Sequence, residues 1–407
     1  MSIESFAEFF MQYLYGGLLN LSTLGYVIAC VIMLQLSMMA VTLYLHRDAA
    51  HRSLNLHPVL RHIFRFWIWC TSGMLTREWV AVHRKHHAMC EKPGDPHSPK
   101  VFGLKKVLLE GAELYRDETK NEETLEKYGR GCPRDWIELN VYERFPWGGI
   151  VLFVLSCLFF YGVPGIILLS IQLVSMPLFA AGIINGIGHH TGYRNFECDD
   201  AATNIVPWGI FVGGEELHNN HHAFPTSAKF SMRPWEFDIG WMYITIFSKL
   251  GLAKVNKVAP QPAMRPAAGE LNADTLRAVI INRMHVLRDY TKQVTLPTLR
   301  FERRRAEAGA MLSRAKRVLV RQPSLLDGRA KARLDEILDN SATLRTVHEF
   351  RDRLQALWQS GAAISNEKLL EQLKQWCAEA EASGIRFLED FAARMRSYAM
   401  SPAPIRA

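Results

Sequence analysis

The sequence predicts an all-α integral membrane protein that carries a soluble helical extension at its C-terminal end. Residues 9–46 and 145–193 contain no Asp, Glu, Lys or Arg. Each run is longer than the roughly 20 apolar residues that cross a bilayer. After a proline-containing linker that follows Lys257, the chain becomes charged and rich in Leu and Ala. We therefore expect a membrane domain over residues 1–257 and a helical extension over residues 258–407.

The uncharged runs predict three to four transmembrane helices. Leu21–Leu45 is one crossing, and the second run is long enough for two. A Gly-Val-Pro-Gly turn at 162–165 divides that run into crossings at about 145–161 and 165–186. Residues 5–19 are apolar but short, and they form either a further crossing or a helix in the membrane interface.

Charge predicts that the polar parts share one side of the membrane. Residues 46–144 follow one crossing and residues from 189 onward follow two more, so both parts face the same side. All 48 Lys and Arg residues lie in those parts, which the positive-inside rule assigns to the cytoplasm together with the C-terminus. The seven cysteines contain no Cys-x-x-Cys pair, so we expect neither disulfides nor a thiolate metal site. No organelle signal is recognised, which favours a bacterial inner membrane.

The extension that follows Lys257 divides into charged stretches with helical periodicity. The expected helices cover about 273–293, 299–320, 328–359 and 366–398. The sequence assigns no function to these helices.

Most of the 15 histidines gather in four short elements. These are His46 and His51; His83, His86 and His87; Asn185 and His189; and His218, His221 and His222. Helix positions i, i+3 and i+4 share one face, so each H-x2-H-H pattern presents three imidazoles to one place. Asn185 and His189 share a face in the same way. His46 and His51 lie about 140° apart on a regular helix, so a metal shared between them requires that helix to end or distort.

These elements predict two metal ions. Together they offer nine imidazoles, which is too many for one ion and suits two. Imidazole alone does not choose among Zn, Cu, Fe and Ni. No carboxylate occupies a ligand position in the histidine elements, which argues against the Glu-x-x-His sites of four-helix bundles. Structural roles are assigned to the other histidines, namely His57, His62, His97, His285 and His348, while His190 is left open beside His189.

Three features beside these elements have ordinary interpretations. Trp79, shortly before the second element, is read as a packing residue. Arg84 and Lys85 point away from the imidazoles, toward either solvent or an anionic headgroup. Residues 213–215, Gly-Gly-Glu, are read as a turn and not as a phosphate loop.

The histidine motifs resemble the three boxes of the membrane fatty-acid desaturases. They read H-R-D-A-A-H at 46–51, H-R-K-H-H at 83–87 and H-N-N-H-H at 218–222. The H-x4-H spacing and the His that opens the third box resemble the Δ9 acyl-CoA desaturases in particular. Flanking residues agree: Glu78-Trp79, Asp95-Pro96-His97, Gly192-Tyr193-Arg194, Gly214-Glu215 and Phe224-Pro225. The resemblance covers residues 21–245.

The resemblance implies four membrane helices beneath a cytosolic cap that holds two Fe2+ ions. With O2 as co-substrate, such an enzyme inserts a cis double bond, here at Δ9, into a saturated acyl chain. One iron would be held by His46, His51, His83, His87 and His221. The other would be held by His86, His189, His218 and His222, with Asn185 acting through a water. The resemblance implies no catalytic residue beyond this metal centre.

The expected partners are membrane lipid, a long-chain acyl substrate and an electron donor. The acyl chain is carried either by coenzyme A or by a phospholipid. No cytochrome b5 segment is recognised, so a separate protein of the ferredoxin or reductase type is expected to supply electrons. The net charge of +8 is mild, and no nucleic-acid partner is expected.

Two other functions remain open. One is a related di-iron membrane hydroxylase or ketolase, which adds oxygen with similar boxes. The other is a non-catalytic metal-binding or transport protein. Transporters place ionisable ligands near the middle of the bilayer, whereas these ligands lie at helix ends or in cytosolic segments.

Overall fold

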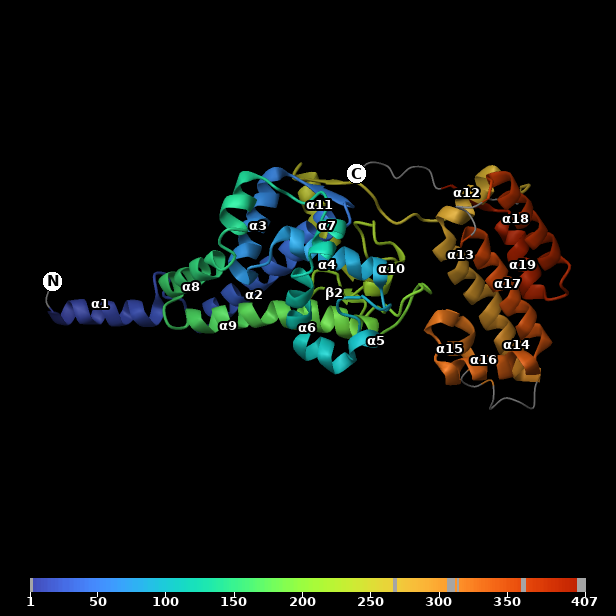
Figure 1. The fold of residues 1–407 in the computed structure, drawn as a ribbon, viewed down its shortest axis with the longest axis horizontal. Coiled ribbons are helices and arrows are strands. Elements are labelled where there is room, and N and C mark those ends of the chain that lie inside the picture. Colours follow the sequence, from blue (N-terminus) through green and yellow to red (C-terminus); the bar gives the residue numbers. More distant parts are fainter. Residues whose placement is uncertain (1–2, 266–268, 306–311, 313–314, 360–363, 401–407) are drawn as a thin grey trace. The chain divides into compact units, whose positions relative to one another are not determined.

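A computed structural model of the chain describes residues 3–265, 269–305, 312, 315–359 and 364–400. The chain forms two compact units. The first comprises residues 1–194 and 200–259, and the second comprises residues 195–199 and 260–407. Both units are mainly helical (Figure 1), in agreement with the predicted fold class.

The first unit contains most of the helices and two pairs of very short strands. Its α-helices are α1 (Ile3–Gly16), α2 (Thr23–Met39), α3 (Pro58–Ser72), α4 (Thr76–Met89), α5 (Pro99–Phe102), α6 (Leu104–Thr119), α7 (Glu122–Tyr128), α8 (Gly148–Tyr161), α9 (Gly165–Met176), α10 (His218–Ala223) and α11 (Ile239–Lys249). Its other helices are the π-helices η1 (Ala40–Ala50), η2 (Glu138–Tyr142) and η3 (Pro177–Ile184) and the 3-10 helix η4 (Ile187–His189). Strand β1 (Leu54–Leu56) pairs antiparallel with β4 (Ala253–Val255), and β2 (Trp208–Gly209) pairs parallel with β3 (Phe237–Asp238).

Two helical stretches of the first unit are long and apolar enough to cross a membrane. They are 23–50, formed by α2 and η1, and 165–189, formed by α9, η3 and η4. Helices α2 and α9 pack side by side (Figure 1). Helix α8 is also apolar, but it has 14 residues, which rise about 21 Å and fall short of a hydrocarbon core of about 30 Å.

The apolar surface of these helices supports membrane association. On α2, Val31 and Ile32 are more than half exposed, and Leu155 on α8 and Ile167 on α9 are similarly exposed. Large apolar side chains gathered at a protein surface mark contacts with a membrane or with another protein. The chain therefore carries a membrane-type surface, while the predicted number of three to four crossings stays a proposal.

A buried ion pair fixes the end of the first long helix. Arg47 and Asp238 form it with fully buried side chains and a nitrogen-to-oxygen distance of 2.9 Å. The guanidinium also lies 3.8 Å from the centre of the Phe230 ring and donates to the carbonyl oxygen of Ala228 at 2.9 Å. Because Arg47 follows His46 directly, these contacts hold the first histidine box in place.

The second unit is a helical bundle with an apolar core. Its helices are α12 (Ala273–Ile281), α13 (Arg283–Tyr290), the π-helix η5 (Thr291–Thr295), α14 (Leu296–Arg305), α15 (Ala315–Val320), the 3-10 helix η7 (Pro323–Leu325), α16 (Gly328–Asn340), α17 (Ala342–Gln359), α18 (Asn366–Glu381) and α19 (Arg386–Met395). Strand β5 (Ala263–Met264) pairs antiparallel with β6 (Tyr398–Ala399). The short strands of both units were not predicted.

Three of the helices predicted for the extension are broken in the structure. The helix expected over 273–293 is interrupted at Asn282, whose side chain donates back to the carbonyl oxygen of Ala278 at 2.9 Å. The helix expected over 328–359 divides at Ser341, whose hydroxyl caps the next helix by accepting from the amide of Leu344. Near Gly384, which has a positive φ of 71°, the last helix divides into α18 and α19. Part of the helix expected over 299–320 lies outside the described residues.

Candidate metal centre

The first histidine box lies on a π-helix. The backbone amide of His51 donates to the carbonyl oxygen of His46, five residues earlier, at 3.0 Å. This i to i+5 pattern runs through η1, which ends at Ala50. A wider helical turn brings side chains five residues apart toward one face. The distortion that the H-x4-H spacing required is therefore present, and its form is a π-helix.

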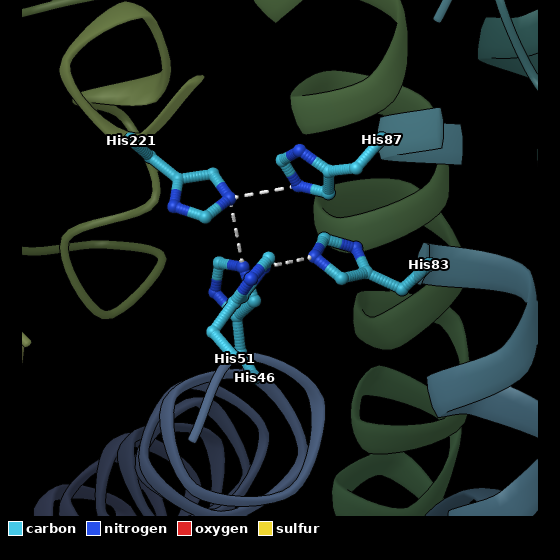
Figure 2. A group of neighbouring side chains, drawn as sticks. All are labelled: His46, His51, His83, His87 and His221. Atoms are coloured by element: carbon cyan, nitrogen blue, oxygen red, sulfur yellow. Dashed lines mark hydrogen bonds between the residues drawn. The ribbon is translucent and has the colours of Figure 1, made fainter. Parts of the chain in front are cut away.

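Five imidazoles converge at the end of this helix. They belong to His46, His51, His83, His87 and His221, and we name them the five-histidine group. Their Nε2 atoms face one another (Figure 2): His51 and His83 are 2.8 Å apart, and the Nε2 of His221 lies 3.1 Å from that of His46 and 2.9 Å from that of His87. Helix α4 supplies two of these residues and the short helix α10 supplies another.

Four more imidazoles form a second cluster. They belong to His86, His189, His218 and His222, and we name them the four-histidine group. The Nε2 of His189 lies 3.2 Å from that of His86 and 3.0 Å from that of His218. The Nε2 of His222 is buried and has no hydrogen-bond partner. The two groups contain the same histidines as the two ligand sets implied by the resemblance, whereas the role expected for Asn185 stays a prediction. That either group binds a metal also stays a prediction.

The donor atoms of the groups fit cations. Both His86 and His189 direct Nδ1 to a carboxylate, so in the neutral ring the proton sits on Nδ1 and Nε2 carries a lone pair. Two such lone pairs 3.2 Å apart repel each other unless a positive ion lies between them. Imidazole nitrogen suits iron as well as zinc, copper and nickel.

Carboxylates support four of the nine imidazoles at Nδ1. Glu215 accepts from His46 at 2.7 Å, Asp95 from His86 at 3.0 Å, Glu91 from His189 at 3.3 Å and Asp200 from His222 at 3.0 Å. Such partners fix the tautomer and the ring orientation of metal-binding histidines. The sequence interpretation missed all four as site residues, although Asp95 and Glu215 stand in the flanking motifs.

Burial disfavours the charged form of several of these imidazoles. It lowers the pKa of His51 to about 3, and it lowers the pKa of His83 and His221 well below the ordinary value, with added repulsion from neighbouring imidazoles. Burial alone would raise the pKa of Asp95, but His86, His97 and the backbone amide of Glu91 together lower this pKa below the ordinary value. At neutral pH the imidazoles of His51, His83 and His221 are therefore in the neutral form that binds metal ions.

Other residues near the boxes differ in part from expectation. Asn185 lines the cavity described below, but it follows η3 and precedes the 3-10 turn η4, so it does not share a regular helix with His189. His97, which was assigned a structural role, lies 4.5 Å from His86 ring to ring and lines the same cavity. His190, which was left open, is exposed and lies outside both groups.

Arg84 and Lys85 in the second box point away from the imidazoles, and their partners are other parts of the protein. Arg84 is half-buried and donates to the carbonyl oxygens of Ala49 and Ala50. Lys85 pairs with Glu118 at 2.8 Å. No disulfide joins the cysteines, as expected, but the sulfur of Cys90 lies 3.8 Å from the Nε2 of His86 at the edge of the four-histidine group.

A cavity of about 380 Å³ reaches the metal centre. Its wall includes His46, His83 and His218 at one part and mainly apolar side chains elsewhere, among them Met176 and Leu173. The Trp79 ring stacks on His83, with centres 4.8 Å apart, and also lines this space, so the residue packs as predicted and touches the cavity as well. A concave apolar site with a few polar groups is the usual form of a small-molecule site.

Comparison with known proteins identifies the family. A family model described as fatty acid desaturase matches residues 21–238, which is more than half of the chain. This chain belongs to that family. It is a fatty-acyl desaturase of the Δ9 type, an oxidoreductase. The predicted family and enzyme class are confirmed.

Individual relatives agree with this family. The chain is 33% identical to an sn-1 stearoyl-lipid 9-desaturase of Synechocystis over 234 residues, which are 55% of this chain and 69% of the relative. It is 27% identical to Delta-9 acyl-lipid desaturase 2 of Arabidopsis thaliana, over 56% of this chain and 74% of the relative. An acyl-CoA 5-desaturase of Anemone leveillei is 29% identical over 53% of this chain and 67% of the relative.

The extension resembles a different family. A model described as transposase matches residues 272–401, about a third of the chain. Nucleases commonly act through a pair of metal ions held by the protein. Within the described residues, however, every cluster of three or more candidate metal ligands lies between residues 46 and 222, in the desaturase part. The match therefore describes a likeness of the extension and leaves the assignment of the enzyme unchanged.

Proposed function

We propose that this desaturase is a di-iron enzyme that converts a saturated fatty-acyl chain to a cis-Δ9 unsaturated chain. The observation that carries the proposal is the pair of imidazole groups, five and four, beside an apolar cavity. Each group would hold one Fe2+ ion through the Nε2 atoms of its histidines, and Asn185 would act on the second iron through a water.

The irons would supply the redox chemistry. With O2, two electrons and two protons, two hydrogens leave adjacent methylene carbons, a double bond forms and two waters are released. Methylene hydrogens are not acidic and methylene carbons carry no leaving group, so acid–base or nucleophilic side chains cannot begin this reaction. The protein would bind the acyl chain, orient the reacting methylene pair beside the metals and exclude water from this region.

Particular side chains fit these tasks. Glu215 accepts from both the Nδ1 of His46 and the hydroxyl of Thr42, each at 2.7 Å, and so fixes one imidazole at the cavity wall. The Trp79 ring stacks on His83 and limits its rotation. Apolar side chains such as Met176 would exclude water from the acyl chain. No residue beyond the metal centre is required as an acid or a base.

A lipid-linked acyl chain is the substrate that we favour. The Synechocystis and Arabidopsis relatives are named for acyl-lipid substrates, whereas the Anemone relative is named for acyl-CoA. The substrate would enter from the membrane, which we propose the first unit crosses three to four times. We propose that this is a bacterial inner membrane, with the histidines and the C-terminus on the cytoplasmic side. A separate ferredoxin- or reductase-type protein would supply the electrons, and no nucleic acid takes part.

Product analysis in a suitable host tests this function. The chain is expressed in cells that lack unsaturated fatty acids, and the position of any double bond is read by mass spectrometry on separated phospholipid and acyl-CoA pools. We expect growth rescue and a Δ9 double bond, and loss of both in His86→Ala and His221→Ala. His190→Ala is the matched control, because this exposed histidine lies outside both groups and should retain rescue. A hydroxylated product would favour the hydroxylase alternative, and no modified product would contradict the proposal.

A further inference from the structure

The carboxylates that hold the histidines are divided unevenly between the two groups. In the four-histidine group, Asp95, Glu91 and Asp200 accept from the Nδ1 atoms of three imidazoles. In the five-histidine group, Glu215 is the one carboxylate in the described part of the chain that accepts from an imidazole, that of His46. The two groups thus differ in nearby negative charge as well as in the number of imidazoles.

The surrounding contacts favour ionised carboxylates in the four-histidine group. Asp95 is almost fully buried and accepts from the backbone amides of Glu91 at 2.7 Å and His97 at 3.1 Å in addition to the His86 ring. Asp200 accepts from the backbone amide of Ala202 at 3.0 Å. Donors of this kind stabilise the charged form of a carboxylate.

One of these charges is partly balanced. The ammonium of Lys100 lies 2.9 Å from Glu91, so it offsets some of that negative charge. Asp95 pairs with His86 and Asp200 with His222, and within the described part of the chain neither carboxylate forms an ion pair with a Lys or Arg side chain. The four-histidine group therefore has the negative charges of Asp95 and Asp200 and a third charge, on Glu91, that Lys100 partly offsets. The five-histidine group has the single charge of Glu215, whose other partner is the neutral hydroxyl of Thr42.

Nearby negative charge stabilises the higher oxidation state of a metal ion. A carboxylate on Nδ1 makes an imidazole a stronger donor, and its charge attracts the extra positive charge of Fe3+ directly in a buried site. The fifth imidazole of the other group is a neutral ligand, so it offers a dipole where the carboxylates offer charges. We therefore propose that the iron in the four-histidine group is oxidised first, and that Asp95, Asp200 and Glu91 are positioning residues that set this order.

This inference rests on the proposed di-iron function, and redox titration tests it without measuring activity. The full-length protein is loaded with 57Fe2+ and its iron content is measured. It is then titrated without O2, using a ferricenium salt as a one-electron oxidant, while Mössbauer and EPR spectra report the state in which one iron of the pair is Fe3+. The equilibrium constant for forming this mixed-valence state measures the difference between the two reduction potentials.

Variants on the two sides should move this constant in opposite directions. Asp95→Asn raises the potential of the iron in the four-histidine group, so the constant should fall about tenfold, equivalent to about 59 mV for one electron. Glu215→Gln makes the other iron harder to oxidise, so the constant should rise. Asp135→Asn is the control, because this carboxylate pairs with Arg65 and lies outside both histidine groups. Asp200→Asn provides a second variant with the same expected sign as Asp95→Asn.

Each outcome has a distinct meaning. If the equilibrium constant rises in Asp95→Asn and falls in Glu215→Gln, the iron in the five-histidine group is oxidised first. If the constant is unchanged in all of the variants, the carboxylates only orient the imidazole rings. Either result overturns the inference. A wild-type protein that binds fewer than two irons would instead contradict the proposed function, before any titration begins.

Discussion

The interiors of the two units are stabilised by different kinds of residues. Around the histidine groups, the first unit buries acidic and basic side chains, including Arg47, Asp95 and Asp238. The second unit buries mainly apolar side chains, and Trp376 and Phe391 lie in its largest core cluster. Buried charges need partners, whereas apolar cores need only close packing. The stability of the first unit should therefore depend on its ion pairs and on the metals proposed for it, whereas the stability of the second unit should not.

Metal removal should separate the two units most strongly. A chelator would leave nine imidazoles, five of them buried, without the cations that we propose they bind. A ligand present at a thousand times its Kd stabilises a protein by about 4 kcal/mol. We expect the amides of α4 and α10 to exchange hydrogen for deuterium much faster after chelation, and those of α17 and α18 to keep their rates. Equal acceleration in both units would show that the distinction is wrong.

Truncating a side chain in the apolar core of the second unit should destabilise that unit and leave metal binding by the first unit unchanged. Trp376 is 1% exposed and donates to the carbonyl oxygen of Phe350 at 2.9 Å. Trp376→Ala should cost the second unit about 3–5 kcal/mol through lost burial and an empty cavity. Hydrogen exchange in α17 and α18 measures the loss. The iron content should stay at the wild-type value, and exposed Arg386→Ala serves as a neutral control.

Two buried arginines provide the finest test of the comparison. Arg47 pairs with Asp238, while Arg351 donates to two backbone carbonyl oxygens, those of Leu319 and Val320. Arg47→Met strands a buried charge and should cost about 3–5 kcal/mol.

The change at Arg351 should have the smaller effect. Arg351→Met leaves two neutral carbonyl groups unpaired, which should cost about 1–3 kcal/mol. Hydrogen exchange within each unit reports both losses. If Arg351→Met lowers the free energy of unfolding more than Arg47→Met does, buried charge is not what distinguishes the first unit from the second.

The sequence predicted the elements that repeat a local pattern. The H-x2-H-H spacing works because α4 is a regular helix over Thr76–Met89, so three imidazoles leave one face. The long uncharged runs likewise predicted α2 and α9, since their composition is set by the surrounding lipid. The family resemblance then supplied the identity of the enzyme, which no spacing rule contains.

What could not be predicted depends on contacts between distant residues. Glu215 meets His46 from 169 positions away, and no periodicity links the two. The H-x4-H spacing required a distorted helix, but sequence does not choose between a π-helix and a helix end. In the extension, the caps at Asn282 and Ser341 broke helices whose apolar pattern continues without interruption. Local polar contacts there outweighed periodicity.

The iron content of the purified protein tests the central claim most directly. The full-length chain is prepared without O2, reconstituted with Fe2+ and analysed by elemental mass spectrometry against protein concentration. We predict two irons per chain, held by the five-histidine and four-histidine groups. One iron per chain, or none under conditions of excess iron, would contradict the account.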